Sequence, residues 1–293
     1  RAQLEIIEDL AKRFPGKISV GMEMFRRSAQ QNLNQWNKGE LSSGQFKNLF
    51  RKNWGNGYAL YKSIFEFLNR NHIPLIGLKS SKKTEDTFRG NDQPGQNDLP
   101  KIDFNDRYHR PFSMSIFGGH QAMEQPYRML LLWEETMAQT VADFLKNPSN
   151  INSKLVILAG GFHVQYGFGI PKRAFRRVPH SYSIVLPTVT ELPPELKDRE
   201  MDVKHVSIPL YSADYAWKIQ YKVLPENKVK LGVLLENSEN TVRIKSVSAN
   251  SNAELAGLKD GDLLLAIDGI KLIDIEDLTD KLKRLVIGDR ARL

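Results

Sequence analysis

Short apolar segments that alternate with amphipathic helical segments constrain the fold of this chain most strongly. The apolar segments are KISVGMEMF, HIPLIGL, KLVILAG and YSIVLP. Residues 4–14, 57–71 and 125–146 place apolar side chains at the spacing of one helical face. Strands that alternate with helices form parallel sheets covered on both faces. The sequence therefore predicts an α/β domain with a parallel-rich sheet and helices on both faces.

Two stretches interrupt this pattern. Residues 80–113 are polar and contain SSKKTED and NDQPGQND, which is typical of a long loop. Residues 188–224 are irregular and rich in proline, and we interpret them as a linker or domain edge. The first domain then covers residues 1–187, and a second domain covers residues 225–293.

Charge and cysteine content exclude several kinds of function. Residues 1–224 hold 31 Lys and Arg against 22 Asp and Glu, so most of the net charge of +8 lies there. No nucleic-acid recognition motif accompanies this charge, and an anionic small ligand or a membrane surface fits it as well. We therefore expect no nucleic-acid partner. The chain has no cysteine, which excludes disulfides, thiolate metal sites and a cysteine nucleophile.

Residues 225–293 have a different character. LGVLLE and VRIKSVSA are β-like, and DIEDLTDKLKRLV predicts a helix for which Asp274, or the residues just before it, can act as N-cap. The segment AGLKDGDLLLAIDG (256–269) resembles the PDZ domain of the bacterial type. The resemblance implies a small α+β domain with one further strand after GDRARL.

The PDZ resemblance also implies a ligand. The family binds extended peptide ends by adding a strand to a sheet edge. By match to its motif, the backbone N–H groups of one loop would receive a terminal carboxylate, and the loop consists of Lys230, Leu231, Gly232 and Val233. A packing module without a peptide ligand is the alternative.

Two strands of the predicted sheet end in side chains that could form a site. Glu23 lies at the end of VGMEMF, and His163 lies in LAGGFHV. Ligands of open parallel sheets bind at the carboxyl ends of the strands. A carboxylate and an imidazole can share a divalent metal ion or form an acid/base pair. Alternatively, Glu23 pairs with Arg26 or Arg27 on the surface, and His163 is a hydrogen-bonded structural residue.

Residues 3–187 resemble the ChaN family of haem-binding, iron-regulated lipoproteins in several separate blocks. The blocks are VGMEMFRRSAQ, the Gln-rich helix that follows it, WG at 54–55, LLWEETMAQTV and LAGGFHVQYGFGIPKR. The family belongs to a wider group, with Tiki and erythromycin-esterase-like proteins, that resembles metal-dependent hydrolases. Its chains begin with a strand and a Gly-Glu-x-His type motif before QLEIIEDL, and a hydrolase function of Glu23 and His163 would depend on that motif.

The ChaN resemblance implies haem bound between two protomers, with a Tyr ligand from one and a His near the propionates from its partner. Tyr166 is the first candidate for the iron ligand, and His163 and His120 compete for the histidine role. Haem propionates also need cations. Those that the first domain offers are Arg173, Arg26, Arg27 and Lys172. The other tyrosine candidates are Tyr58, Tyr61, Tyr108 and Tyr127.

Three functions stay open at this point. The first, which we favour, is a haem-binding protein of the bacterial cell envelope that acts in iron or haem uptake. The resemblance implies that such a protein is homodimeric and lipid-anchored on the periplasmic or outer-membrane face, with the PDZ domain docking a peptide or partner. The second is a Tiki-like metal-dependent hydrolase of peptides or esters. The third is a structural envelope protein that uses the PDZ domain for recruitment.

Overall fold

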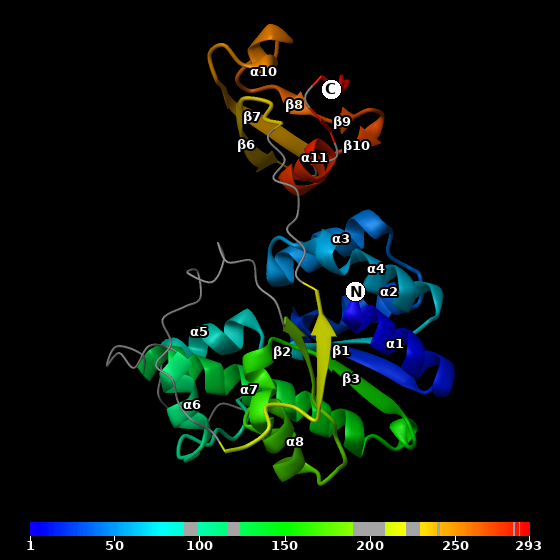
Figure 1. Ribbon diagram of the computed structural model, residues 1–293, viewed down its shortest axis with the longest axis vertical. Coiled ribbons are helices and arrows are strands. Elements are labelled where there is room, and N and C mark those ends of the chain that lie inside the picture. Colours follow the sequence, from blue (N-terminus) through cyan, green and yellow to red (C-terminus); the bar gives the residue numbers. More distant parts are fainter. Residues whose placement is uncertain are drawn as a thin grey trace. The chain divides into compact units, whose positions relative to one another are not determined.

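A computed structural model describes residues 1–90, 99–116, 124–189, 209–220, 229–238, 241–283, 285–286 and 288–293. The chain divides into two compact units (Figure 1). The first comprises Arg1–Gly55 and Lys62–Tyr221, and the second comprises Asn56–Tyr61 and Lys222–Leu293. Within the described residues, no helix is long and apolar enough to cross a membrane.

A parallel sheet forms the centre of the first unit. Its described strands are β1 (Ile18–Arg26), β2 (Leu75–Lys79) and β3 (Lys154–Leu158), in the order β2-β1-β3. β1 pairs in parallel with both neighbours and is buried along almost its whole length. A strand covered on both faces must be apolar on both, which explains the continuous apolar run in KISVGMEMF. The predicted α/β class is therefore confirmed.

Helices cover the two faces of this sheet (Figure 1). On one face, Phe25 of β1 packs with Phe46, Phe50 and Phe65 from the helices after it, at ring-centroid distances of 5.6 to 5.9 Å. On the other face, Leu78 of β2 packs in one cluster with Met137, Val141, Ile170 and Ala174. The helices are α1 (Ala2–Arg13), α2 (Gln30–Asn37), α3 (Ser43–Trp54), α4 (Tyr58–Arg70), α5 (Lys82–Gly90), α6 (His109–Ile116), α7 (Glu124–Lys146) and α8 (Ile170–Arg177).

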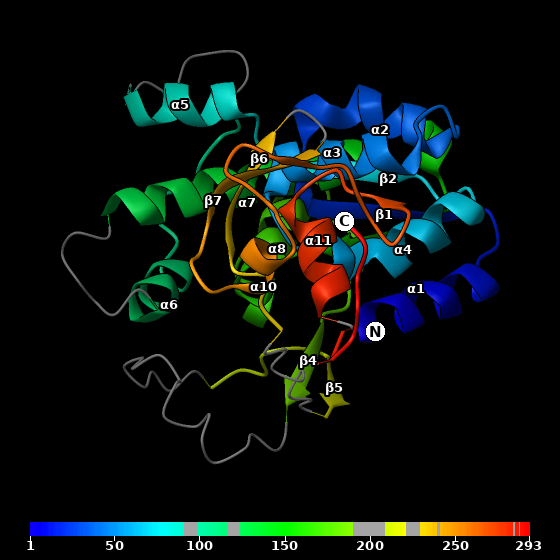
Figure 2. The same cartoon turned by 90° about the horizontal axis from the view of Figure 1, so that it is seen from above.

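The structure corrects the interpretation of residues 80–113 as a loop. Helix α5 and the start of helix α6 lie in that stretch, on opposite sides of α7 (Figures 1 and 2). Each helix buries few apolar side chains, and Phe88 is the one by which α5 joins the cluster with Met129 and Leu132. In α5, Phe88 is the single large apolar side chain in about two turns, so the sequence shows no helical periodicity there.

The fourth predicted strand exists but lies outside the main sheet. YSIVLP contributes to β4 (Val185–Val189), which pairs in parallel with β5 (Tyr215–Ile219) in a separate two-stranded sheet. β5 lies within residues 188–224, which the sequence indicated to be irregular. The apolar run predicted a strand correctly, but it carried no information on which strand would be its partner.

The second unit is a small antiparallel β domain with short helices. Strands β6 (Val233–Ser238), β7 (Thr241–Val247) and β8 (Leu263–Leu264) form a sheet in that order, and β9 (Ala266–Ile267) pairs with β10 (Ile270–Lys271). Helices α10 (Asn252–Leu255) and α11 (Ile275–Leu282) complete it. Asp274 caps α11 by accepting a hydrogen bond from the Asp277 amide, as the sequence predicted. The core consists of Val242, Ile244, Leu264, Ile267, Leu272 and Leu278.

Candidate functional site

Glu23 and His163 meet at the carboxyl end of the main sheet. Gly21 of β1 faces Leu78 and Ile157, and Glu23, two residues later, points to the same side because side chains alternate along a strand. His163 follows β3 in the short helix η4 (Gly161–His163). Its Nε2 lies 3.4 Å from Glu23 Oε1, and the Gly160 amide donates to Glu23 Oε2 at 2.7 Å. Glu23 thus pairs with His163 and not with Arg26, which instead binds Glu85.

Glu134 of α7 is the main site residue that sequence reasoning missed. Its side chain is fully buried, with His163 Nδ1 at 3.1 Å and His109 Nε2 at 2.9 Å from its two oxygens. His163 therefore lies between two carboxylates. The available signal was the pair Glu134 and Glu135 within the otherwise apolar face of LLWEETMAQTV, because a carboxylate on a buried helix face requires a partner.

Burial and hydrogen bonding act in opposite directions on these groups. Burial disfavours the charged form of His163, but hydrogen bonds to Glu134 and Glu23 outweigh it and raise the pKa of His163 from 6.5 to about 9. Burial likewise opposes the charge of Glu134, but hydrogen bonds from His109 and His163 lower its pKa to about 2. The pKa of Glu23 is also lowered, against burial, by His163. At neutral pH the group is a buried imidazolium between two carboxylates.

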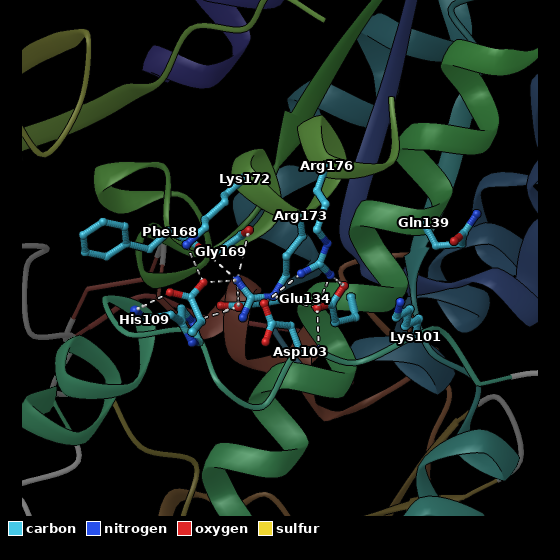
Figure 3. A network of polar contacts seen from close by, with 12 residues as sticks. Lys101, Asp103, His109, Glu134, Gln139, Phe168, Gly169, Lys172, Arg173 and Arg176 are labelled. Atoms are coloured by element: carbon cyan, nitrogen blue, oxygen red, sulfur yellow. Dashed lines mark hydrogen bonds and ion pairs between the residues drawn. The ribbon is translucent and has the colours of Figure 1, made fainter. Parts of the chain in front are cut away.

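Arg173 of α8 belongs to a polar network that includes Glu134 and His109 (Figure 3). Its side chain is 1% exposed, and its Nη1 lies 3.7 Å from Glu134 Oε2 and donates to the Phe168 carbonyl. Its Nε lies 3.3 Å from Glu135 Oε1, and Glu135 also binds Arg176. The charge of Arg173 is thus neutralised inside the fold. Its neighbour Lys172 is engaged by Asp106 at 2.8 Å.

Gly169 of the loop AGGFHVQYGFGIPKR lets the backbone pack closely against His163 and Glu134. A Cβ on Gly169 would lie 2.3 Å from the His163 carbonyl oxygen and 2.9 Å from Glu134 Oε1. No side chain fits there unless the backbone moves. Tyr166 adopts a left-handed backbone conformation with φ of 56° in this loop, and its amide donates to the Ser212 carbonyl at 2.9 Å. The loop therefore holds His163 against Glu134 by close backbone approach.

A cavity of about 630 Å³ opens beside His163. Its walls come mainly from α6 and α7 and are mostly apolar, with Arg89 as a cation. Ligand sites of proteins usually enclose ~300–1,000 Å³ behind walls of this kind. The lining residues are Arg89, Phe112, Ser113, Gln125, Pro126, Met129, Leu130, Trp133, Phe162 and His163.

The candidate tyrosines differ in their distance from this cavity. Tyr166 packs edge-on against Phe112, a wall residue, at a centroid distance of 5.4 Å, and stacks on Phe168 at 5.5 Å. Tyr108 is 66% exposed and stacks on Phe168 at a centroid distance of 6.0 Å. Burial raises the pKa of Tyr127 to about 12, and its hydroxyl lies 3.4 Å from His109 Nδ1.

The remaining predicted site residues are placed as follows. Tyr58 is buried and Tyr61 is half-buried in α4. His120 lies outside the described residues. Over the described ranges, no three His, Asp or Glu side chains are arranged so that they could hold a metal ion.

The predicted peptide loop of the second unit ends at Val233, the first residue of β6, and β6 lies at the edge of its described sheet. Lys230 is exposed, whereas Leu231, Gly232 and Val233 are half-buried. Gly232 has φ of +83°, and a Cβ there would lie 2.2 Å from the Ser251 Cβ. Only glycine suits this position.

Comparison with known families decides the classification. The family model described as "Haem-binding uptake, Tiki superfamily, ChaN" matches residues 1–174, more than half of the chain. The chain belongs to this family. The second unit of this ChaN-family chain matches a PDZ domain model over residues 243–292. Both resemblances drawn from the sequence are therefore confirmed.

One solved structure and the curated proteins complete the comparison. The structure described as "Cofacial heme binding to ChaN of Campylobacter jejuni" is 17% identical in sequence, with a TM-score of 0.47. The similarity covers 66% of this chain and 77% of that one. No curated protein matches the sequence.

Proposed function

We propose that this protein binds haem in the cavity beside His163 and acts in haem or iron uptake. The observation that carries the proposal is an apolar, partly aromatic cavity of about 630 Å³ whose lining residues all lie within the matched ChaN region. Haem is flat and apolar at its centre and carries two propionates, so its site needs an apolar wall, an axial donor and nearby cations.

The residues present fit these needs. Phe112, Met129 and Leu130 supply the apolar wall, and Arg89 lies at the cavity as a cation. Tyr166 is our candidate to bind the iron, because its ring contacts Phe112 of the cavity wall. Neutral tyrosines ionise with difficulty, and a cationic ferric iron favours the phenolate.

His163 is not free to bind the iron. Both of its ring nitrogens face carboxylates, Glu23 and Glu134, so neither offers a free lone pair. Its positive charge is balanced by these two carboxylates, so Arg89 is the cation at the cavity wall in this proposal. Arg173 remains a structural cation in this proposal because its charge is neutralised inside the fold.

A titration with haemin tests the proposal. We expect a saturable Soret band with the charge-transfer feature of a ferric tyrosinate, and loss of that feature in Tyr166→Phe. Tyr211→Phe is the matched control because Tyr211 is 94% exposed. An unchanged spectrum in Tyr166→Phe would move the ligand to another residue, and absence of saturable binding by the wild type would end the haem proposal.

The contact between Glu23 and His163 also favours a second function, a Tiki-like metal-dependent hydrolase of peptides or esters. A carboxylate next to an imidazole at a cavity wall is the arrangement used in acid/base catalysis. Supplying zinc, manganese or cobalt to the protein and assaying peptide and ester turnover tests this idea. Turnover that Glu23→Gln abolishes would support it, whereas the haem proposal predicts no turnover.

The PDZ unit provides a docking site in our proposal. A peptide C-terminus would add to the edge strand β6, with its carboxylate at the loop of residues 230–233. The glycine-only conformation at Gly232 supports this role. A library of C-terminal peptides screened by fluorescence polarisation tests it, and a lack of any saturable ligand would leave the unit as a packing module.

We also propose that the protein works as a homodimer in the cell envelope, held there by a lipid anchor. Membership of a haem-binding uptake family supports this assembly and location. Sedimentation with and without haemin tests the dimer, and fractionation of cells that express the natural full-length protein tests the location. A monomer at all concentrations, or recovery in the cytosol, would contradict these two points.

A further inference from the structure

The ammonium group of Lys79 lies against two indole rings and has no role in the site described above. Lys79 is the last residue of β2, so it lies at the carboxyl edge of the sheet. Its Nζ is 4.2 Å from the ring centroid of Trp133 and 5.5 Å from that of Trp54. Trp54 is the last residue of α3 and is 40% exposed.

The two carboxylates that act on Lys79 are already paired with other cations. Glu85 Oε1 accepts hydrogen bonds from Arg26 at 2.7 Å and from Trp133 Nε1 at 2.9 Å. Glu23 faces His163. The described part of the chain places no carboxylate within ion-pair distance of Lys79 Nζ. Burial lowers the pKa of Lys79, and the attraction of Glu85 and Glu23 only partly opposes it.

This unpaired cation lies directly behind the cavity wall. Trp133 lines the cavity and carries the ammonium over its ring. Glu23, the other neighbour, contacts His163, which also lines the cavity. Ligands of parallel sheets bind at this edge. Indole faces hold a cation in place but do not neutralise it, so its charge stays available to an anion.

We propose that Lys79, held between Trp54 and Trp133, binds a carboxylate of the ligand in the cavity, which for haem is one propionate. This role rests on the proposed haem function. The lysine stem is flexible and its head is a point charge with three donors, so Nζ can leave the indole faces to reach an anion. The indoles keep the side chain over the sheet edge until the ligand arrives.

The test compares two porphyrins that differ in whether their propionates are free carboxylates or uncharged methyl esters. Haemin carries two free propionates, and its dimethyl ester carries none. In Lys79→Met we expect the Kd for haemin to rise about tenfold and the Kd for the ester to stay within about twofold, because a hydrogen bond between charged groups is lost only in the first case. Lys83→Met is the matched control, since Lys83 is exposed on α5 next to the same sheet edge.

Each outcome decides the matter. Equal weakening of both porphyrins, or no change in either, would overturn the role of Lys79 and leave haem binding intact. Lys79→Arg keeps the charge and should retain tight binding of haemin, which separates charge from packing if Lys79→Met folds poorly. If wild-type protein binds neither porphyrin saturably, the haem function fails and the role of Lys79 fails with it.

Discussion

Replacing Glu134 by Gln should destabilise the first unit far more than its conservative shape suggests. Glu134 lies 2.9 Å from His109, 3.1 Å from His163 and 3.7 Å from Arg173, with its side chain fully buried. Burial disfavours the charged form of His163, yet hydrogen bonds to Glu134 and Glu23 raise its pKa from 6.5 to about 9, so the imidazolium depends on Glu134. Breaking a buried ion pair from one side costs ~3–5 kcal/mol, and we expect a loss in that range.

Urea unfolding followed by the helical far-UV circular dichroism signal measures this loss, because the long helices belong to the first unit. Glu124→Gln on the same helix is the matched control. Its side chain is 53% exposed and pairs with Arg110, so it should cost less than ~1 kcal/mol. A cost for Glu134→Gln as small as that of the control would refute the reasoning.

Three further predictions concern pH and two glycines. Because folding raises the pKa of His163 from 6.5 to about 9, its protonation adds to the free energy of unfolding in full below pH 6.5, and this addition is lost as the pH rises through about 9. The urea midpoint should therefore fall between these two pH values, and a midpoint that does not change would contradict the prediction. Gly169→Ala should lower the free energy of unfolding by ~1–3 kcal/mol, because the new Cβ would contact the His163 carbonyl. Gly161→Ala in the same loop should lower it little, because the nearest atom to its Cβ is 3.9 Å away. Equal losses in the two variants would exclude the steric argument. Gly232→Ala should lower the melting temperature of the PDZ unit more than Gly257→Ala does. Both glycines have a positive φ, but a Cβ at Gly257 would meet no atom within 4 Å. Calorimetry that shows the larger loss for Gly257→Ala would contradict the described geometry of the loop.

The features of this structure that were predicted correctly from the sequence are those that depend on local sequence patterns. The apolar run around Val20 is buried on both faces, so it identified β1 without knowledge of its neighbours. The position of Asp274 before an amphipathic segment marked the start of α11, because a cap depends only on the adjacent residues. The same logic placed Glu23 and His163 at one edge, since parallel strands end together.

The remainder depended on contacts between residues that are distant in the sequence, whose partners no local pattern identifies. Glu134 lies 29 residues before His163, and within α7 its charge alone is more typical of an exposed helix position. Arg173 looked like a surface cation for the same reason, although its charge is used inside the fold. The cavity arises where α6 and α7 leave space beside His163, and packing of this kind has no signature in the sequence.

Filling the cavity tests the central claim most directly. Leu130→Trp places an indole into the wall of the cavity from α7, while Leu60→Trp adds the same ring at a position that is 78% exposed. With folding verified by circular dichroism, we predict that Leu130→Trp raises the Kd for haemin at least about tenfold, since the ring takes the volume that the ligand needs. Leu60→Trp should bind as the wild type does. Wild-type affinity in Leu130→Trp would contradict haem binding in this cavity.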